Sequence, residues 1–326
     1  MPLIGLWKTR VMLMGRRKKG DPINGWLILD KPLEMSSTQA LAKARYILNA
    51  RKAGHAGTLD PMATGVLPLA FGEATKTVAF MQDASKTYRF TVTWGVQTNT
   101  DDTEGEAIET SDLRPSEDDI IDLLQNYQGV ISQTPPQFSA IKIDGQRAYA
   151  MARKGEDVKI ASREVTIYDL ELTEYSDDYA IFECECSKGT YVRSLARDMG
   201  RDLGCFGHIS ELRRIAVGVF DENDAISLDE LSEMMHSAPE HEVLLPVEAP
   251  LDDIPALFMT DDEALRLRSG QSVVLFSKDG QNRMNAAGLD ATKEKETIVL
   301  TLSDHKPICL AEVTGAEIKP KRVLNI

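Results

Sequence analysis

The spacing of apolar residues along the chain predicts a mixture of strands and helices. Residues 88–94 alternate strictly between apolar and polar side chains, which is typical of a strand with one buried face. Further strands are predicted at residues 25–30, 165–170, 180–186 and 209–220. Helices are predicted where apolar residues recur at helical spacing, at residues 36–48, 115–127, 192–203 and 228–235. Residues 52–72, by contrast, are rich in Gly and Pro, and we expect a structured loop there.

The last third of the chain has a different composition. Residues 221–263 contain 14 acidic residues and neither Lys nor Arg, and Pro246, Pro250 and Pro255 interrupt them. This shift in composition predicts a domain boundary near residue 250. The residues that follow contain short apolar runs separated by turns, at residues 272–276, 297–302 and 308–311. We therefore expect a small β-rich domain of about 70 residues at this end.

Composition and charge limit the class of protein. The chain has 326 residues, of which 42% are hydrophobic, enough for two or three domains with cores of their own. The net charge is −14, but residues 1–58 carry +8 and the remainder carries −22. Charge alone favours a solvated acidic surface, although a basic region can still dock a nucleic acid locally. The four cysteines suit a reducing compartment, and no apolar run reaches the ~18–20 residues of a membrane helix, so we expect a cytoplasmic protein.

Residues 54–68 form the segment with the most chemical content. Their glycines suit a phosphate-binding loop, but the Gly-Lys-Ser/Thr of such loops is missing, and the glycine spacing does not fit a dinucleotide fingerprint. The chain has no Gly-x-Ser-x-Gly hydrolase motif, and nothing nearby joins His55 and Asp60 as metal ligands. What remains is one carboxylate, Asp60, which Pro61 biases away from helical dihedrals. An ordinary turn or helix cap is the alternative, and we expect no second carboxylate in reach of the motif.

This segment resembles the catalytic motif of the bacterial pseudouridine synthases of the TruB type, which act on the T loop of tRNA at position 55. Four other segments resemble motifs of the same family, and all five occur in the family's order. They are residues 25–32, 86–88, 133–140 and 187–195. Residues 267–271 and 321–325 are similar to the edges of the family's PUA-type RNA-binding domain.

The resemblance implies an α/β (α+β) fold with two domains. A mixed, largely antiparallel sheet with flanking helices would occupy residues 21–250, with an RNA-gripping insertion at about 133–160, and a PUA-like domain would occupy residues 251–326. The implied reaction is an isomerisation. The N-glycosidic bond of a flipped-out uridine is cleaved, the uracil turns, and its C5 joins C1′. Because no redox change or external group transfer occurs, we expect neither a cofactor nor a metal.

The resemblance assigns the reaction to three side chains. Asp60 would be the nucleophile or essential carboxylate, and Arg193 would pair with it and keep it ionised and aimed. Tyr88 would present an aromatic face to the uracil and a hydroxyl that helps to move the C5 proton. Without the resemblance, Arg193 would equally suit a surface salt bridge, and Tyr88 would be taken as a tyrosine packed within its strand.

Three more residues would bind the substrate. The resemblance makes His55 the group that fills the gap left by the extruded base, while Tyr191 and Leu212 would close the base pocket. Lys31 and Pro32 are expected to give structural support beneath the site.

The implied partner is the T arm of tRNA, bound by a monomer, with no role for DNA or a membrane. Residues 1–20 would be a disordered basic arm, and residues 136–155 combine cations with aromatics, which suits an RNA loop with splayed bases. Two alternatives remain open: a guide-RNA-dependent pseudouridine synthase subunit, and a tRNA-folding chaperone without catalysis. Residues 62–68 resemble the bacterial, stand-alone form.

Overall fold

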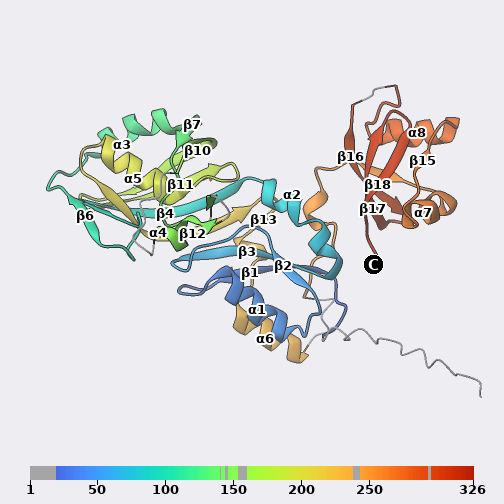
Figure 1. The fold of residues 1–326 in the computed structure, drawn as a ribbon, viewed down its shortest axis with the longest axis horizontal. Helices are drawn as coiled ribbons and strands as arrows, with labels where there is room; N and C mark the ends of the chain where they lie inside the picture. Colours follow the sequence, from blue (N-terminus) through green and yellow to red (C-terminus); the bar gives the residue numbers. More distant parts are fainter. Residues whose placement is uncertain (1–19, 140, 144–145, 153–159, 238–242, 293–294) are drawn as a thin grey trace, which may run out of the picture.

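The computed structural model describes residues 20–139, 141–143, 146–152, 160–237, 243–292 and 295–326. The predicted basic arm therefore lies outside the described residues except for Gly20. The described residues form two separate large sheets, one of nine strands and one of five, joined by a short connection (Figure 1). None of the described helices combines the length and the apolar composition needed to cross a bilayer.

The first sheet is mixed and largely antiparallel, as predicted. Its main strands are β1 Gly25–Lys31, β3 Ala63–Phe71, β12 Gly207–Val217, β4 Lys86–Trp94, β11 Tyr179–Cys186, β10 Arg163–Tyr175 and β7 Gly129–Gln133, named here in their spatial order. Two short strands pair at its side, β2 Ala53–His55 with β3 and β13 Phe220–Asp221 with β12. Only the pairing of β12 with β3 is parallel. Strict alternation correctly located β4, whose residues point by turns into the core and towards the surface.

The expectation of a loop at residues 52–72 is wrong for more than half of that stretch. β3 is buried along almost its whole length, so its sequence is a continuous apolar run without the alternation of a half-buried strand. Gly65 marks where β3 meets β12, because a Cβ there would lie 2.2 Å from the Arg214 carbonyl oxygen. Gly65 and Pro68, which suggested a loop, are therefore part of a central strand.

Helices cover the sheet at both ends. α1 (Ser37–Ile47) and α6 (Leu228–Ser237) lie side by side next to β1, and α5 (Val192–Asp202) packs against β12 and β4 (Figure 1). α3 (Glu117–Leu124) packs on β10. The predicted helices at 36–48, 192–203 and 228–235 agree with these bounds to within two residues, whereas the 115–127 helix ends as a 3₁₀ turn, Gln125–Tyr127.

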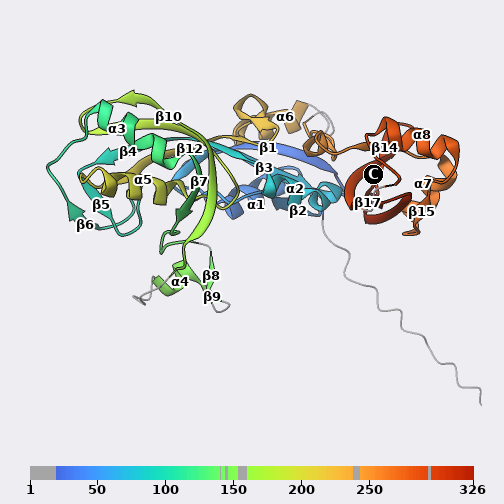
Figure 2. The ribbon, with the colours of Figure 1, turned by 90° about the horizontal axis from the view of Figure 1, so that it is seen from above.

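The insertion leaves the sheet after β7 and returns at β10. Its described parts are the strands β8 Lys142–Ile143 and β9 Gln146–Arg147 and the helix α4 Ala148–Ala152. Figure 2 shows these elements projecting from one side of the first sheet. The two ends of the insertion stay close together, because Gln133 of β7 pairs with Arg163 of β10.

The second sheet contains β14 Ala256–Phe258, β16 Thr297–Ser303, β17 Lys306–Thr314, β18 Glu317–Val323 and β15 Val273–Val274, in that spatial order. The predicted β-rich character is confirmed, but two helices were not predicted, α7 (Asp261–Arg268) and α8 (Lys278–Ala286). An apolar cluster joins the two sheets and includes Trp26 and Phe220 from the first and Leu300 and Leu310 from the second. Because apolar contacts hold the sheets together, the second is packed on the first rather than tethered by a free linker.

Candidate active site

One cavity of about 300 Å³ contains most of the predicted site residues. Asp60, Tyr88, Tyr191, Arg193 and Leu212 all line it, although they come from widely separated parts of the chain. Asp60 lies on the connection between β2 and β3, Tyr88 on β4 and Leu212 on β12, while Tyr191 immediately precedes α5, which carries Arg193. The sheet order places β12 next to β4, and this brings Tyr88 and Leu212 onto neighbouring strands.

Asp60 and Arg193 form an ion pair. Asp60 Oδ2 lies 2.8 Å from Arg193 Nη2, so the contact predicted between these residues is present. The Asp60 carboxylate is 41% exposed, whereas the Arg193 guanidinium is almost fully buried. The arginine is therefore a fixed cation, and it orients a carboxylate that remains open to the cavity.

Hydrogen bonds from Ser37 and Lys31 fix the loop that carries Asp60. The Ser37 hydroxyl donates to the Leu59 carbonyl at 2.9 Å and accepts from the Leu59 N–H at 2.8 Å. Lys31 is fully buried, and its Nζ donates to the carbonyls of Met35 at 2.6 Å, Pro32 at 2.8 Å and Pro61 at 3.4 Å. Burial lowers the pKa of Lys31 to about 8, while the nearby Asp60 opposes this shift. These contacts are the physical basis for the structural support expected from Lys31.

Replacing Lys31 by Met is expected to lower the free energy of unfolding by about 3 kcal/mol, because the part-buried carbonyls that this buried lysine bonds lose their donor. Urea unfolding followed by circular dichroism measures this loss. The control is Lys43→Met, an exposed lysine on α1, for which we expect a change below about 0.5 kcal/mol. Equal unfolding midpoints for the two variants would contradict a supporting role for Lys31.

Arg193 has more partners than the sequence suggested. Its Nη1 donates to the Thr100 carbonyl at 2.9 Å and to Asp102 Oδ2 at 3.2 Å, and its Nη2 also donates to the Phe138 carbonyl at 3.0 Å. Asp102 is buried and is a second carboxylate partner of Arg193 that the sequence did not predict, although it does not line the cavity of Asp60. It lies in an acidic turn 42 residues beyond Asp60, and only the fold brings the two carboxylates to one arginine.

The remaining predicted residues of the cavity surround the space beside Asp60. Leu212 faces Phe90 across the β12–β4 pairing and is nearly buried. Tyr191 lies beneath the Arg163 guanidinium, whose carbon is 5.2 Å from the ring centroid. Burial raises the pKa of the Tyr88 hydroxyl above its usual value, and the adjacent Arg214 acts in the opposite direction. Tyr88 is therefore a neutral phenol near neutral pH, able to donate a hydrogen bond.

His55 is the one predicted site residue that does not line the cavity. It ends β2, five residues before Asp60, and is half-buried. Its Nδ1 has no hydrogen-bond partner among the described residues. Burial lowers the pKa of His55, and the charge of Arg214 adds to this effect, so the ring is neutral near pH 7.

Four basic residues that line the cavity were not predicted as site residues, Lys86, Arg163, Lys188 and Arg214, and the first and last of them are buried. Arg214 is buried and donates to the carbonyls of Val66 at 2.8 Å and Gly57 at 3.2 Å, and within the described residues no carboxylate forms an ion pair with it. Lys86 donates to the carbonyls of Gln82 at 2.7 Å, Met81 and Ala84, and burial lowers its pKa to about 8. Lys86 lies within the motif 86–88, which was the available signal, whereas nothing distinguished Arg214 from its neighbour Arg213 in the sequence.

The part of the chain that the structure describes offers no metal centre beside these residues. Within it, no group of three or more His, Cys, Asp or Glu side chains is placed to hold a metal ion.

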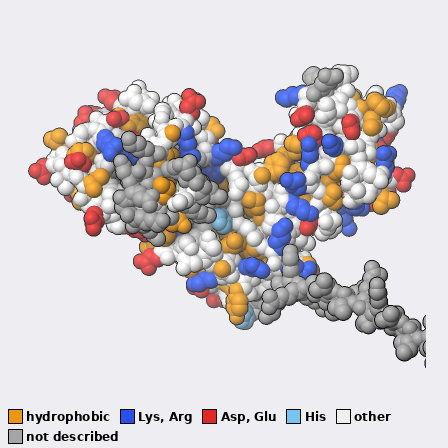
Figure 3. All heavy atoms as spheres, in the orientation of Figure 1, with side chains coloured by type: hydrophobic (Ala, Val, Ile, Leu, Met, Phe, Trp, Pro, Cys, Tyr) orange, Lys and Arg blue, Asp and Glu red, His pale blue; other side chains and the backbone are white. Residues whose placement is uncertain are grey.

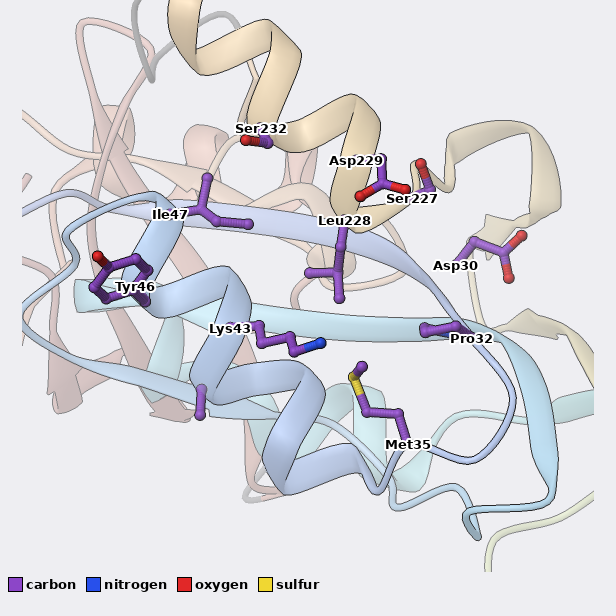
Figure 4. A pocket seen from close by; sticks show the side chains of 11 residues that line it. Asp30, Pro32, Met35, Lys43, Tyr46, Ile47, Ser227, Leu228, Asp229 and Ser232 are labelled. Carbon is purple, nitrogen blue, oxygen red and sulfur yellow. The ribbon is translucent and has the colours of Figure 1, made fainter.

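A larger cavity, of about 650 Å³, lies between α1 and α6 and lacks this chemistry (Figure 4). Its labelled charged residues are Asp30, Lys43 and Asp229, and Asp30 is already paired with Arg213 at 3.0 Å. It shares no lining residue with the cavity of Asp60. The ion-paired carboxylate of Asp60 and most of the predicted site residues therefore lie in the smaller cavity.

Comparison with known proteins identifies the relatives of this chain. Residues 45–192 match the family model described as TruB family pseudouridylate synthase, N-terminal domain. Residues 193–252 match that of the tRNA pseudouridylate synthase B C-terminal domain. Two relatives named tRNA pseudouridine synthase B, from Brucella anthropi and Agrobacterium fabrum, are each 51% identical to this chain. They cover 96% and 95% of it and 99% and 97% of their own lengths.

The fold is also found among solved structures. A chain of a Cbf5-Nop10-Gar1 complex superimposes with a TM-score of 0.69 at 25% identity, covering 92% of this chain and 84% of its own length. A chain from an H/ACA RNP bound to a substrate RNA shares the fold with a TM-score of 0.68 at 22% identity, covering 96% and 92%. On the strength of the near full-length relatives, the chain belongs to the TruB family of pseudouridine synthases, enzymes that isomerise uridine to pseudouridine in tRNA.

Proposed function

We propose that this chain converts the uridine at position 55 in the T loop of tRNA to pseudouridine, without a guide RNA, cofactor or metal. The observation that carries the proposal is the Asp60–Arg193 ion pair in a cavity that Tyr88, Tyr191 and Leu212 also line. The relatives that are 51% identical over nearly the whole chain are named as tRNA enzymes, which favours a tRNA substrate over a guide-dependent one.

The reaction rearranges bonds and protons of the substrate and leaves its composition unchanged. The bond from N1 of uracil to C1′ of the ribose breaks, and a bond from C5 to C1′ forms. The proton leaves C5, and N1 gains one. Asp60 is proposed as the nucleophile or essential carboxylate that meets the positive charge at the ribose, and Arg193 keeps it aimed.

The other residues are proposed to hold the flipped uracil. The cavity is at the lower end of the size range typical of small-ligand pockets, which suits a single nucleoside. The Tyr88 ring and Leu212 would contact the base, and Tyr191 would close the pocket from the side of α5. His55 would lie in the gap left in the T loop, and its Nδ1, unpartnered among the described residues, is available for a hydrogen bond there.

Positive charge around the cavity supports an RNA substrate. Arg163 and Lys188 line it without being buried, so a phosphate backbone could approach them. On the molecular face drawn in Figure 3, Lys and Arg side chains are frequent between the two sheets and on the adjoining surface of the second. We propose that residues 251–326 form a PUA-like RNA-binding domain and that the insertion grips the T arm, with the enzyme acting as a cytoplasmic monomer.

The decisive experiment is incubation of the purified chain with unmodified tRNA transcript in EDTA, followed by mapping of pseudouridine. We expect a single new pseudouridine, in the T loop. Product that appears only when a guide RNA is added would support the guide-dependent alternative, and tRNA refolding without any pseudouridine would support the chaperone alternative. Loss of activity in EDTA that one transition metal restores would contradict the proposal that the reaction needs no metal.

A further inference from the structure

We propose that Arg197, one helical turn beyond Arg193, is a positioning residue for the reaction. It fixes the first residues of the insertion, 133–139, on α5, so that Arg193 can hold Asp60 and the insertion at the same time. Residues 133–139 are called the outgoing stem below. The inference rests on the proposed catalytic role of Asp60.

The first two residues of the outgoing stem are hydrogen-bonded to α5 and to the residue that precedes it. Gln133 makes two hydrogen bonds with the backbone of Tyr191: its Oε1 accepts from the Tyr191 N–H at 2.8 Å, and its Nε2 donates to the Tyr191 carbonyl at 3.1 Å. The Thr134 carbonyl accepts from Ser194 Oγ and from Arg197 Nη2, both at 2.9 Å. The stem is therefore aligned along one side of α5.

Arg193 then links the stem to the catalytic carboxylate. Its Nη2 donates to the Phe138 carbonyl at 3.0 Å and contacts Asp60 Oδ2 at 2.8 Å. Since one nitrogen serves both acceptors, a shift of the stem changes the position of the group that aims Asp60. Reaction rates are sensitive to such shifts, because misplacement by about 1 Å can cost on the order of 100-fold.

Arg197, like Arg193, forms an ion pair with a buried aspartate. Its Nη1 lies 3.0 Å from Asp101 Oδ2, and both residues are buried. Asp101 and Asp102 are neighbours in the turn between β5 (Val96–Thr98) and β6 (Ala107–Thr110), where Asp101 has a φ of 62°. This conformation presents consecutive carboxylates to arginines four residues apart on α5, Asp101 to Arg197 and Asp102 to Arg193.

Arg197 does not take part in the chemistry directly. It lines a different cavity, together with Thr134 and Asp101, and that cavity shares no lining residue with the proposed uracil pocket. It acts through a neutral acceptor, the Thr134 carbonyl, and its planar guanidinium can serve this carbonyl and Asp101 together. A lysine donates from one nitrogen and cannot reproduce the planar fork in which Nη1 bonds Asp101 and Nη2 bonds the Thr134 carbonyl.

The test compares Arg197→Lys with a matched control, Asp198→Asn, in the full-length enzyme. Asp198 is the more exposed partner of Arg197, at 2.8 Å from its Nε, and it bonds the guanidinium rather than the stem. For Arg197→Lys we expect kcat, and with it the single-turnover rate constant, to fall about 10-fold, while the Kd for tRNA stays within about threefold. Asp198→Asn is expected to change kcat by less than about twofold. An unchanged kcat for Arg197→Lys, or a loss seen only in Kd, would overturn the proposal.

A second variant tests the link without a change in charge at α5. Ser194→Ala removes the other donor to the Thr134 carbonyl, and we expect a smaller decrease in kcat in the same direction. Hydrogen exchange provides a readout that does not depend on activity. The stem amides at residues 137–139 are expected to exchange faster in Arg197→Lys, with α5 unchanged. This result would stand even if position 55 proved not to be the substrate, whereas unchanged exchange at those amides would overturn the proposal.

The pH profile separates positioning from general stability. Burial raises the pKa of Asp101 to about 6, against the opposing charges of Arg197, Arg193 and Arg201. The charged groups around it are Arg193, Arg197, Asp198 and Arg201 on α5 and Asp102 on its own turn, while His208 of β12 bonds the Val96 carbonyl. We expect the ratio of wild-type to Asp101→Asn kcat to be about 10 above pH 7 and to approach 1 below pH 6. A ratio independent of pH would count against Asp101 as the partner that fixes Arg197.

The contribution of Asp101 to the stability of the fold is expected to vary with pH in the opposite direction to its contribution to kcat. The pKa of Asp101 is higher in the folded state than the ordinary value of 3.8. This group therefore stabilises the fold at low pH, and the contribution is lost as pH rises through about 6. A loss of activity below pH 6 that instead followed a falling melting temperature would assign Asp101 to folding and overturn its link to positioning.

Discussion

Asp60→Asn is expected to reduce the rate of pseudouridine formation by at least about 10³-fold while the affinity for tRNA stays within about threefold. The substitution keeps the size of the side chain but removes the charge that faces the ribose. Asp60 is partly exposed and contributes little to the core, so the fold should be unaffected. The effect belongs almost entirely to the chemical step.

Single-turnover assays with saturating enzyme measure this step, and filter binding measures the affinity. Asp178→Asn is a suitable control, because Asp178 is 81% exposed and pairs with Arg114 at a distance from the cavity. It should retain full activity. An Asp60→Asn enzyme that still formed more than a trace of pseudouridine would remove Asp60 from the catalytic role.

Arg193→Met is expected to abolish activity and also to lower the free energy of unfolding by about 3 kcal/mol. The loss of activity follows from the loss of the partner of Asp60. The loss of stability comes mainly from Asp102, which is 3% exposed and would remain buried without its arginine. Asp60 is open to solvent and adds little to this penalty. Arg193→Lys should recover part of the stability but little of the activity, because one lysine nitrogen cannot take the places of both Nη2 at Asp60 and Nη1 at Asp102.

Urea unfolding and single-turnover assays on the same preparations test both parts. Arg89→Met provides the control, because the Arg89–Glu183 pair is a comparable contact of 2.8 Å on the surface. Its removal should cost less than about 1 kcal/mol. If Arg193→Met were as stable as Arg89→Met, Asp102 would not depend on Arg193 for its burial.

The sequence predicted the elements whose pattern is local. The alternation at residues 88–94 identified β4, and the apolar spacing at 192–203 identified α5. It failed for β3, because a strand buried on both faces has no alternation, and because Gly65 and Pro68 resemble loop residues. It also gave no sign of α7 and α8, whose short apolar stripes are interrupted by charged residues.

For the site, the sequence supplied the residue types and the family motifs supplied their roles. Asp60 and Arg193 were paired through the resemblance, and the structure contains that contact. Asp101 and Asp102 belong to no motif and lie in an acidic turn that a sequence alone assigns to solvent. Their burial could not be predicted, because it depends on arginines more than 90 residues further along the chain.

The sequence by itself therefore determined the strands with one solvated face, the amphipathic helices and Asp60, the carboxylate that precedes Pro61 on a loop. These depend on neighbours within a few residues, so local periodicity records them. Only the tertiary structure decided which charges meet: Arg193 with Asp60 and Asp102, Arg197 with Asp101, and Arg214 without an acid in the described residues. Pairings between buried charges are set by sheet order and helix packing, which bring distant segments into a medium where an unpaired charge is costly.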